Sequence, residues 1–249
     1  MARARRQRRR SFGHRLRKVL VTGMVTVATL VAVLVLGLRW VAPPITSFMV
    51  QRQARAWWAG DRDWRLDHEW TDWEAISPWA ALAIVAAEDQ KFPEHHGFDL
   101  ESIADAWAEN REGRRVRGAS TISQQVAKNL FLWSGRSYLR KGIEAVLTVL
   151  VELSLPKQRI LEMYLNVAEF GDGIFGVGAA SRAFFGKAPA DLEPAEAALL
   201  AAVLPNPSSL HVNAPSAYVT DRRNWILDQM QKLGGPAYLA DRSASVNPR

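Results

Sequence analysis

The most prominent feature in the pattern of hydrophobic and polar positions is a run of twenty residues without a charge, from Val19 to Leu38. A helix of that length spans roughly 30 Å, the thickness of the hydrocarbon layer of a bilayer. A core helix of a soluble domain does not need this length. A cleaved signal peptide usually has an apolar region of about 7–15 residues that ends at a small-x-small site, and no convincing site follows this run. The pattern therefore predicts an uncleaved transmembrane helix over 19–40.

After residue 76 the apolar positions recur with the period of an α-helix. Ser77-Pro78 is typical of a helix start, and the apolar stretch WAALAIVAA follows it directly. Glycines and prolines separate further predicted helices, and no alternating pattern longer than about four residues favours a strand. The pattern predicts one mainly α domain over 77–240 and a C-terminal tail over 241–249, with helices near 99–112, 119–132, 137–155, 157–169, 173–185, 194–203 and 215–233.

Residues 41–76 connect the apolar run to this domain and are rich in tryptophan. Tryptophan is enriched at membrane–water interfaces, where its ring lies in apolar surroundings and its N–H stays hydrated. Ordinary packing against the domain would account for the same composition. The sequence leaves both interpretations open for Trp57, Trp58, Trp64, Trp70 and Trp73.

The net charge of +7 is concentrated at one end of the chain. Residues 1–18 hold nine Arg or Lys and no acid, whereas the remaining 23 basic residues face 25 acidic ones, so residues 19–249 carry −2. By the positive-inside rule, the basic tail stays in the cytoplasm and the domain lies outside. Because the domain itself is not basic, no nucleic-acid partner is predicted.

Glu88 and Asp89 end the apolar helix that begins at Pro78. A helix that is apolar nearly all round is buried, and burial raises the pKa of a carboxyl group, which makes it a plausible proton acceptor. Two acids at a helix end are also common as caps or ion-pair partners. The neighbouring His95 and His96 are expected to make structural hydrogen bonds, because no second ligand spacing supports a metal site and the chain contains no Cys.

The segment Gly118–Asn129, GASTISQQVAKN, begins with small and hydroxyl residues. The hydroxyls of Ser120 and Thr121 are placed to cap a helix, whose N-terminus favours anions. Gln125, Lys128 and Asn129 then follow on one helix face. A polar face with one cation suits a phosphorylated sugar, although a solvated helix face would also hold a lysine.

Two later motifs look structural by composition. Arg140 and Glu144 in RKGIE have the spacing of an i, i+4 ion pair, and a glutamate beside two cations is expected to be ionised. In Pro156–Asn166, PKQRILEMYLN, the proline starts a helix.

Together, in this order and spacing, the motifs resemble those of the peptidoglycan glycosyltransferases, the family that also supplies the N-terminal domain of bifunctional penicillin-binding proteins. The matches are E-D-x-x-F-x-x-H-x-G at Glu88–Gly97, G-A-S-T-I-S-Q-Q-x-x-K-N at Gly118–Asn129, R-K-x-x-E at Arg140–Glu144 and I-L-E-x-Y-L-N at Ile160–Asn166. The resemblance covers about residues 70–240, and the downstream stretches resemble the monofunctional branch.

The resemblance implies a mainly α, lysozyme-like domain with a large lobe and a small membrane-proximal jaw. It implies that the chain polymerises lipid II into β-1,4-linked glycan strands and releases undecaprenyl diphosphate. Glu88 aligns with the family's general base and Glu144 with its second catalytic glutamate. The substrate-binding residues implied are Asp89, Ser120, Thr121, Gln125, Lys128, Asn129, Arg140 and Lys157.

The same resemblance implies a bacterial inner-membrane protein with a periplasmic catalytic domain, and it leaves partners among the cell-wall synthesis proteins open. No cofactor is predicted, apart from a divalent cation, Mg²⁺ or Mn²⁺, that is left open near Glu144. A lysozyme-like enzyme that cleaves peptidoglycan is one rival, but such an enzyme meets no diphosphate and has no use for the cluster of Lys128, Arg140 and Lys141. An inactive scaffold of wall assembly is the other. No transpeptidase domain is expected, because Ser154-Leu155-Pro156-Lys157 contains a helix-breaking proline and no K-T-G follows.

Overall fold

The structure is a computed structural model that describes residues 2–104, 120–135 and 137–239. It divides into two compact units, residues 1–41 and 42–249. The first unit contains one helix, α1 (Ala2–Gly37), and its segment Arg17–Gly37 is long and apolar enough to cross a membrane. Its mean hydropathy of 2.6 agrees with the predicted transmembrane helix.

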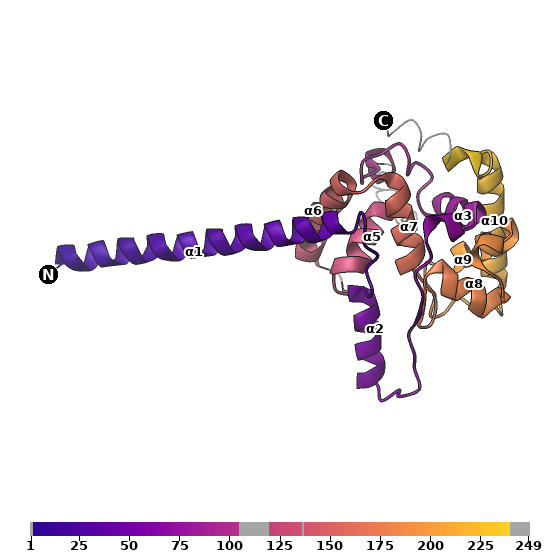
Figure 1. Cartoon of the computed structure of the whole chain (residues 1–249), viewed down its shortest axis with the longest axis horizontal. Coiled ribbons are helices and arrows are strands. Elements are labelled where there is room, and N and C mark those ends of the chain that lie inside the picture. Colours follow the sequence, from indigo (N-terminus) through magenta and orange to yellow (C-terminus); the bar gives the residue numbers. More distant parts are fainter. Residues whose placement is uncertain (1, 105–119, 136, 240–249) are drawn as a thin grey trace. The chain divides into compact units, whose positions relative to one another are not determined.

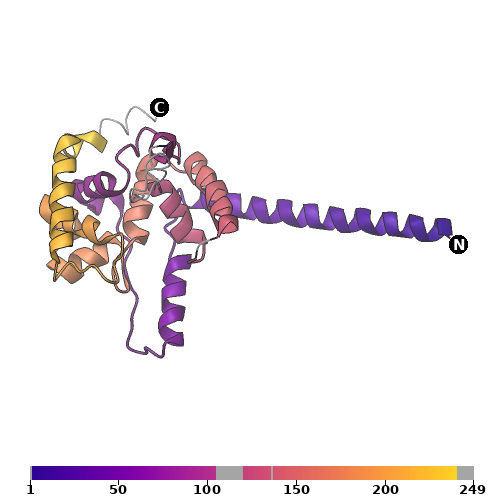
Figure 2. The ribbon, with the colours of Figure 1, turned by 180° about the vertical axis from the view of Figure 1, so that it is seen from behind.

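The second unit is mainly helical, as the sequence predicts. Figures 1 and 2 show two groups of helices: α3, α8, α9 and α10 lie on one side, and α2, α5 and α6 lie on the other. Helix α7 lies between them and contacts α5 and α6 as well as α3 and α8. The helices are α2 (Ser47–Trp58), α3 (Pro78–Glu88), α5 (Ile122–Phe131), α6 (Tyr138–Ser154), α7 (Lys157–Val167), α8 (Val177–Phe185), α9 (Pro194–Val203) and α10 (Ala217–Lys232), with short 3-10 turns at Trp73–Ala75 and Pro189–Asp191.

A small sheet with the order β1-β3-β2 joins the connector to the domain. Strand β1 (Asp67–His68) pairs in parallel with β3 (Ile174–Phe175), and β2 (Glu169–Gly171) pairs antiparallel with β3 across a bulge. Asn166 reinforces this junction because its side-chain amide donates to the Thr71 carbonyl at 2.8 Å and accepts from the Thr71 N–H at 2.7 Å. The structural interpretation of the I-L-E-x-Y-L-N motif is thus confirmed for its asparagine.

The predicted helices differ from the observed ones in two places. Helix α2 was not predicted, and it packs on α5 through the Ser47 hydroxyl, which donates to the Leu132 carbonyl at 2.6 Å. The helix predicted over 173–185 begins only at Val177, because the β2–β3 hairpin occupies the residues before it. The helix predicted over 99–112 is observed for residues 100–104, and its remainder lies outside the described residues.

The tryptophans of the connector divide between the two interpretations. Trp57 and Trp58, at the end of α2, are 72% and 90% exposed. Trp64 and Trp70 are half-buried, and their rings are covered by the guanidinium groups of Arg52 and Arg159. Packing therefore accounts for Trp64 and Trp70 but not for the pair that ends α2.

Candidate active site

Glu88 lies at the C-terminal end of α3, where the chain leaves the core. Residues 80–86 of this helix are buried, because every side chain from Ala80 to Ala86 is apolar and neighbouring helices cover it on several sides. The Glu88 side chain is 16% exposed. Gln125 Nε2 of α5 donates to Glu88 Oε2 at 2.8 Å, and Arg222 of α10 lies 3.5 Å from Oε1. Three elements distant in sequence thus meet at one carboxylate.

Burial raises the pKa of Glu88 above the ordinary glutamate value. The hydrogen bond from Gln125 and the charges of Arg222 and Lys128 act in the opposite direction but do not cancel the effect of burial. A carboxylate with a raised pKa that keeps some contact with solvent is suited to accept a proton. The effect of burial predicted from the apolar helix is confirmed in direction.

A cluster of cations surrounds the second glutamate. Glu144 is 3% exposed, Arg140 NH1 donates to its Oε2 at 2.9 Å, and Lys141 Nζ donates to Oε1. The predicted Arg140–Glu144 pair is confirmed, but it is buried rather than a surface pair. Both carboxylate oxygens are engaged, so this glutamate holds two cations in place.

Lys128 is within electrostatic reach of both glutamates. Burial lowers its pKa, and the negative charges of Glu144 and Glu88 raise it in part. Its ammonium lies 5.4 Å from the ring centroid of Phe48, and within the described part of the chain it has no salt-bridge partner. A half-buried cation that is not neutralised by a direct contact is suited to an anionic ligand.

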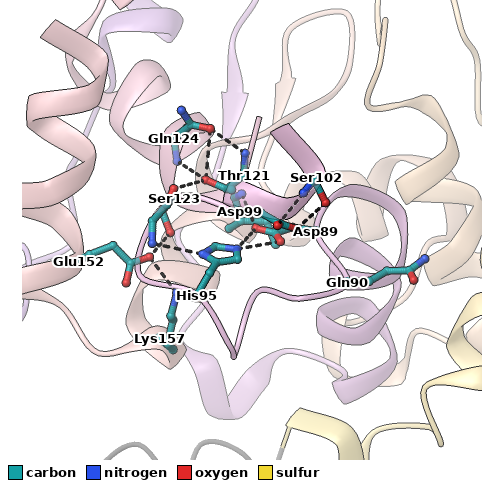
Figure 3. Close-up of polar contacts among 12 residues, drawn as sticks. Asp89, Gln90, His95, Asp99, Ser102, Thr121, Ser123, Gln124, Glu152 and Lys157 are labelled. Atoms are coloured by element: carbon teal, nitrogen blue, oxygen red, sulfur yellow. Dashed lines mark hydrogen bonds and ion pairs between the residues drawn. The ribbon is translucent and has the colours of Figure 1, made fainter. Parts of the chain in front are cut away.

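Asp89 belongs to a different network from its neighbour Glu88 (Figure 3). Its carboxylate contacts His95 Nε2 at 2.9 and 3.0 Å and accepts the backbone N–H of Ile122 at 2.9 Å. His95 Nδ1 accepts the N–H of Gly97, so the Nε2 nitrogen carries the proton that is donated to Asp89. The structural interpretation of His95 is confirmed. The anion at the N-terminus of α5 is the protein's own Asp89.

The loop that follows α3 and contains His95 and Gly97 packs closely against α6. Gly97 has a φ of +90°, and an added Cβ would lie 2.9 Å from Thr148 Cγ2. The Thr121 hydroxyl donates to the Gly97 carbonyl at 2.7 Å and accepts the N–H of Gln124, in a capping box with the Gln124 side chain. The predicted cap of the helix is therefore confirmed for Thr121, whereas Ser120 is exposed and Ala119 lies outside the described residues.

The predicted substrate-binding residues separate into two groups. Gln125, Lys128 and Arg140 lie around Glu88 and Glu144, and Asn129 is buried one turn after Gln125 on α5. Lys157 lies instead near the Asp89 network, where its ammonium pairs with Glu152 at 2.8 Å (Figure 3). The same ammonium lies 4.4 Å from the ring centroid of Phe92.

Two residues of the site were not predicted. Arg222 lies on α10, which carries none of the four motifs. Tyr164 lies in the I-L-E-x-Y-L-N motif, which looks structural by composition, and it donates its hydroxyl to Gln125 Oε1 at 3.3 Å. Lys141 belongs to the predicted cation cluster with Lys128 and Arg140, and its i, i+3 spacing from Glu144 predicts the observed contact.

The side chains around Glu144 do not fit a divalent cation held by the protein. Mg²⁺ and Mn²⁺ prefer oxygen ligands, whereas the groups that contact Glu144 are ammonium and guanidinium. In the described ranges, no group of three or more His, Cys, Asp or Glu could hold a metal ion. Among the described residues, Arg140 and Lys141 supply the positive charge next to Glu144.

Comparison with known proteins shows the family to which the chain belongs. A model of the transglycosylase family matches residues 60–231, which include both glutamates and the helices from α3 to α9. The match begins inside the predicted connector, before β1, and ends within α10.

Curated relatives cover most of the chain. The biosynthetic peptidoglycan transglycosylase of Xanthomonas campestris pv. campestris (strain B100) is 57% identical over 205 residues, which are 82% of this chain and 83% of the relative. The protein of the same name from Xanthomonas oryzae pv. oryzae is 58% identical over 205 residues, 82% of this chain and 84% of the relative. That from Citrobacter koseri is 57% identical over 197 residues, 79% and 81% of the two chains. The chain therefore belongs to the transglycosylase family.

Proposed function

We propose that the chain is a peptidoglycan glycosyltransferase that extends glycan strands from lipid II at the outer face of the bacterial inner membrane. The observation that carries the proposal is that a largely buried carboxylate, which keeps some contact with solvent, lies near a group of cations. Glu88 is suited to take a proton, and Lys128, Arg140 and Lys141 are suited to receive a diphosphate.

In the proposed reaction, Glu88 accepts the proton of the 4-hydroxyl of the acceptor sugar. That oxygen forms a bond to C1 of the donor sugar, while the bond between C1 and the diphosphate oxygen breaks with inversion. The electron pair of the broken bond leaves on undecaprenyl diphosphate, whose charge the cations stabilise. Oε1 of Glu88 is the better proton acceptor, because Oε2 is already held by Gln125 at 2.8 Å.

Glu144 is proposed to act through the cations. With both of its oxygens engaged, it orients Arg140 and Lys141 toward the leaving group and offsets their mutual repulsion. No step is assigned to a metal ion.

The exposed side of α6 supports contact with the bilayer. Large apolar side chains are exposed along this helix although its other side packs on α5, and such a face is suited to the membrane interface. They include Tyr138, Leu139, Val146 and Leu153, which are 99%, 73%, 62% and 80% exposed. A membrane-associated site would meet a substrate whose lipid tail stays in the bilayer, while α1 anchors the chain with its basic end in the cytoplasm.

The test uses purified full-length protein in detergent with labelled lipid II. The wild type is expected to produce glycan strands, Glu88→Gln to abolish them, and Glu144→Gln to reduce them strongly. If the folded wild type bound lipid II and left it unchanged over a range of detergents and with added Mg²⁺, the scaffold interpretation would replace this proposal. Release of short sugars from finished peptidoglycan would favour a cleaving enzyme.

A further inference from the structure

We propose that Tyr164 is a positioning residue that orients the Gln125 side chain so that its amide N–H, and not its carbonyl, faces Glu88. The inference rests on the proposed function of Glu88 as the base. It concerns a residue of α7 that lies behind Gln125 and is not in hydrogen-bond contact with Glu88 itself.

The chain of contacts runs through one amide. The Tyr164 hydroxyl donates to Gln125 Oε1 at 3.3 Å, and Gln125 Nε2 donates to Glu88 Oε2 at 2.8 Å. A primary amide has one accepting end and one donating end. With the accepting end occupied by Tyr164, only the donating end is left for the carboxylate.

Tyr164 is a firmer anchor than Gln125. It is 2% exposed on a helix whose residues from Ile160 to Val167 are all buried, whereas Gln125 is half-buried. Burial raises the pKa of the Tyr164 phenol well above its ordinary value, so the hydroxyl keeps its proton and remains a donor. The amide orientation is therefore set from the core side.

An N–H facing Glu88 favours the ionised carboxylate, which is the form that can act as a base. The other charged groups facing Glu88 are Arg222 of α10, Lys128 of α5 and its own neighbour Asp89. Helix α9 also packs on α3, and its one titratable residue, Glu196, pairs with Lys187. Without Tyr164 the amide can turn its carbonyl to Glu88, which favours the protonated carboxyl group.

The experiment measures kcat/KM for lipid II against pH in full-length Tyr164→Phe, which removes only the hydroxyl. The acidic limb of the profile is expected to move to higher pH, and kcat/KM near that limb to fall roughly fivefold, the loss expected for one neutral hydrogen bond. Tyr238→Phe is the matched control. It removes a tyrosine hydroxyl that donates to the Gln90 carbonyl at 2.7 Å, and it should leave the limb in place.

A double-variant cycle separates positioning from a general loss of stability. Gln125→Met removes the amide, so it should move the limb in the same direction, and adding Tyr164→Phe to it should cause no further movement. An unmoved limb in folded Tyr164→Phe, or additive movements in the double variant, would overturn the proposal. If Tyr164→Phe does not fold, an unmoved limb in Gln125→Met overturns it equally.

Failure of this inference is distinct from failure of the proposed function. If the wild type makes strands and Glu88→Gln does not, Glu88 stands as the base, and an unmoved limb removes only the role of Tyr164. If the wild type makes no strands, the function itself falls and no pH profile can be measured.

Discussion

Glu88 and Asp89 are consecutive carboxylates at the end of one helix, yet they belong to different regions of the molecule. The Asp89 side chain is 3% exposed and is bound by His95 and by the N-terminus of α5. The Glu88 side chain is 16% exposed, with one close hydrogen bond and a more distant arginine. Asp89, whose carboxylate has its hydrogen bonds satisfied within the protein, stabilises the fold. Glu88, whose carboxylate has fewer close partners, keeps one oxygen available for chemistry.

The largest expected effect comes from Glu88→Gln, which keeps the side-chain shape and removes the base. Turnover of lipid II should fall by about 10³-fold, within the range for loss of a general base. Thermal unfolding should occur at the wild-type temperature or above it, because the variant no longer buries a charge whose folded pKa is raised by desolvation. Turnover within tenfold of the wild type would contradict the assignment.

Asp89→Ala should give the opposite pattern. It leaves His95 Nε2–H and the Ile122 N–H buried without their acceptor, and the free energy of unfolding should fall by about 3 kcal/mol. Denaturant unfolding followed by tryptophan fluorescence measures this loss. A variant as stable as the wild type would show that Asp89 is not the structural partner of the pair.

Lys128→Met tests whether an un-neutralised cation serves the reaction rather than the fold. Turnover should fall by about 10²-fold, as for other single groups that stabilise a developing anion. Stability should change little, because Lys128 is partly buried without a salt bridge among the described residues. A large loss of stability with unchanged turnover of the folded fraction would reverse this interpretation.

The smallest effect expected is a difference between the pH dependence of turnover and the pH dependence of stability, both of which follow from the protonation of Glu88. Because the folded pKa of Glu88 is raised, turnover should fall as pH drops through that value, above the range of an ordinary glutamate. Over the same interval the folded state takes up more protons than the unfolded one, so the contribution of Glu88 to stability should increase. Comparing Tm against pH for the wild type and Glu88→Gln isolates that contribution, and parallel curves would contradict it.

Much of the helical fold and of the candidate site could be predicted from local patterns in the sequence. The apolar run, the cap at Ser77-Pro78, the Thr121 cap and the Arg140–Glu144 pair depend on residues within a few positions of one another, and each is observed. The order and spacing of the four motifs also indicate the family and single out both glutamates, because motifs of this kind can be recognised along the chain without knowing which helices meet.

Only the tertiary structure decided how the side chains divide between support and chemistry. Arg222 reaches Glu88 across more than 130 positions, and nothing near it in sequence signals that contact. The family resemblance implies that Asp89 and Lys157 bind substrate, yet the packing of the helices gives both of them partners inside the protein. Sequence determines which groups are present and which are close neighbours on a helix. The fold determines which of their lone pairs and protons remain unsatisfied, because that depends on which helices meet.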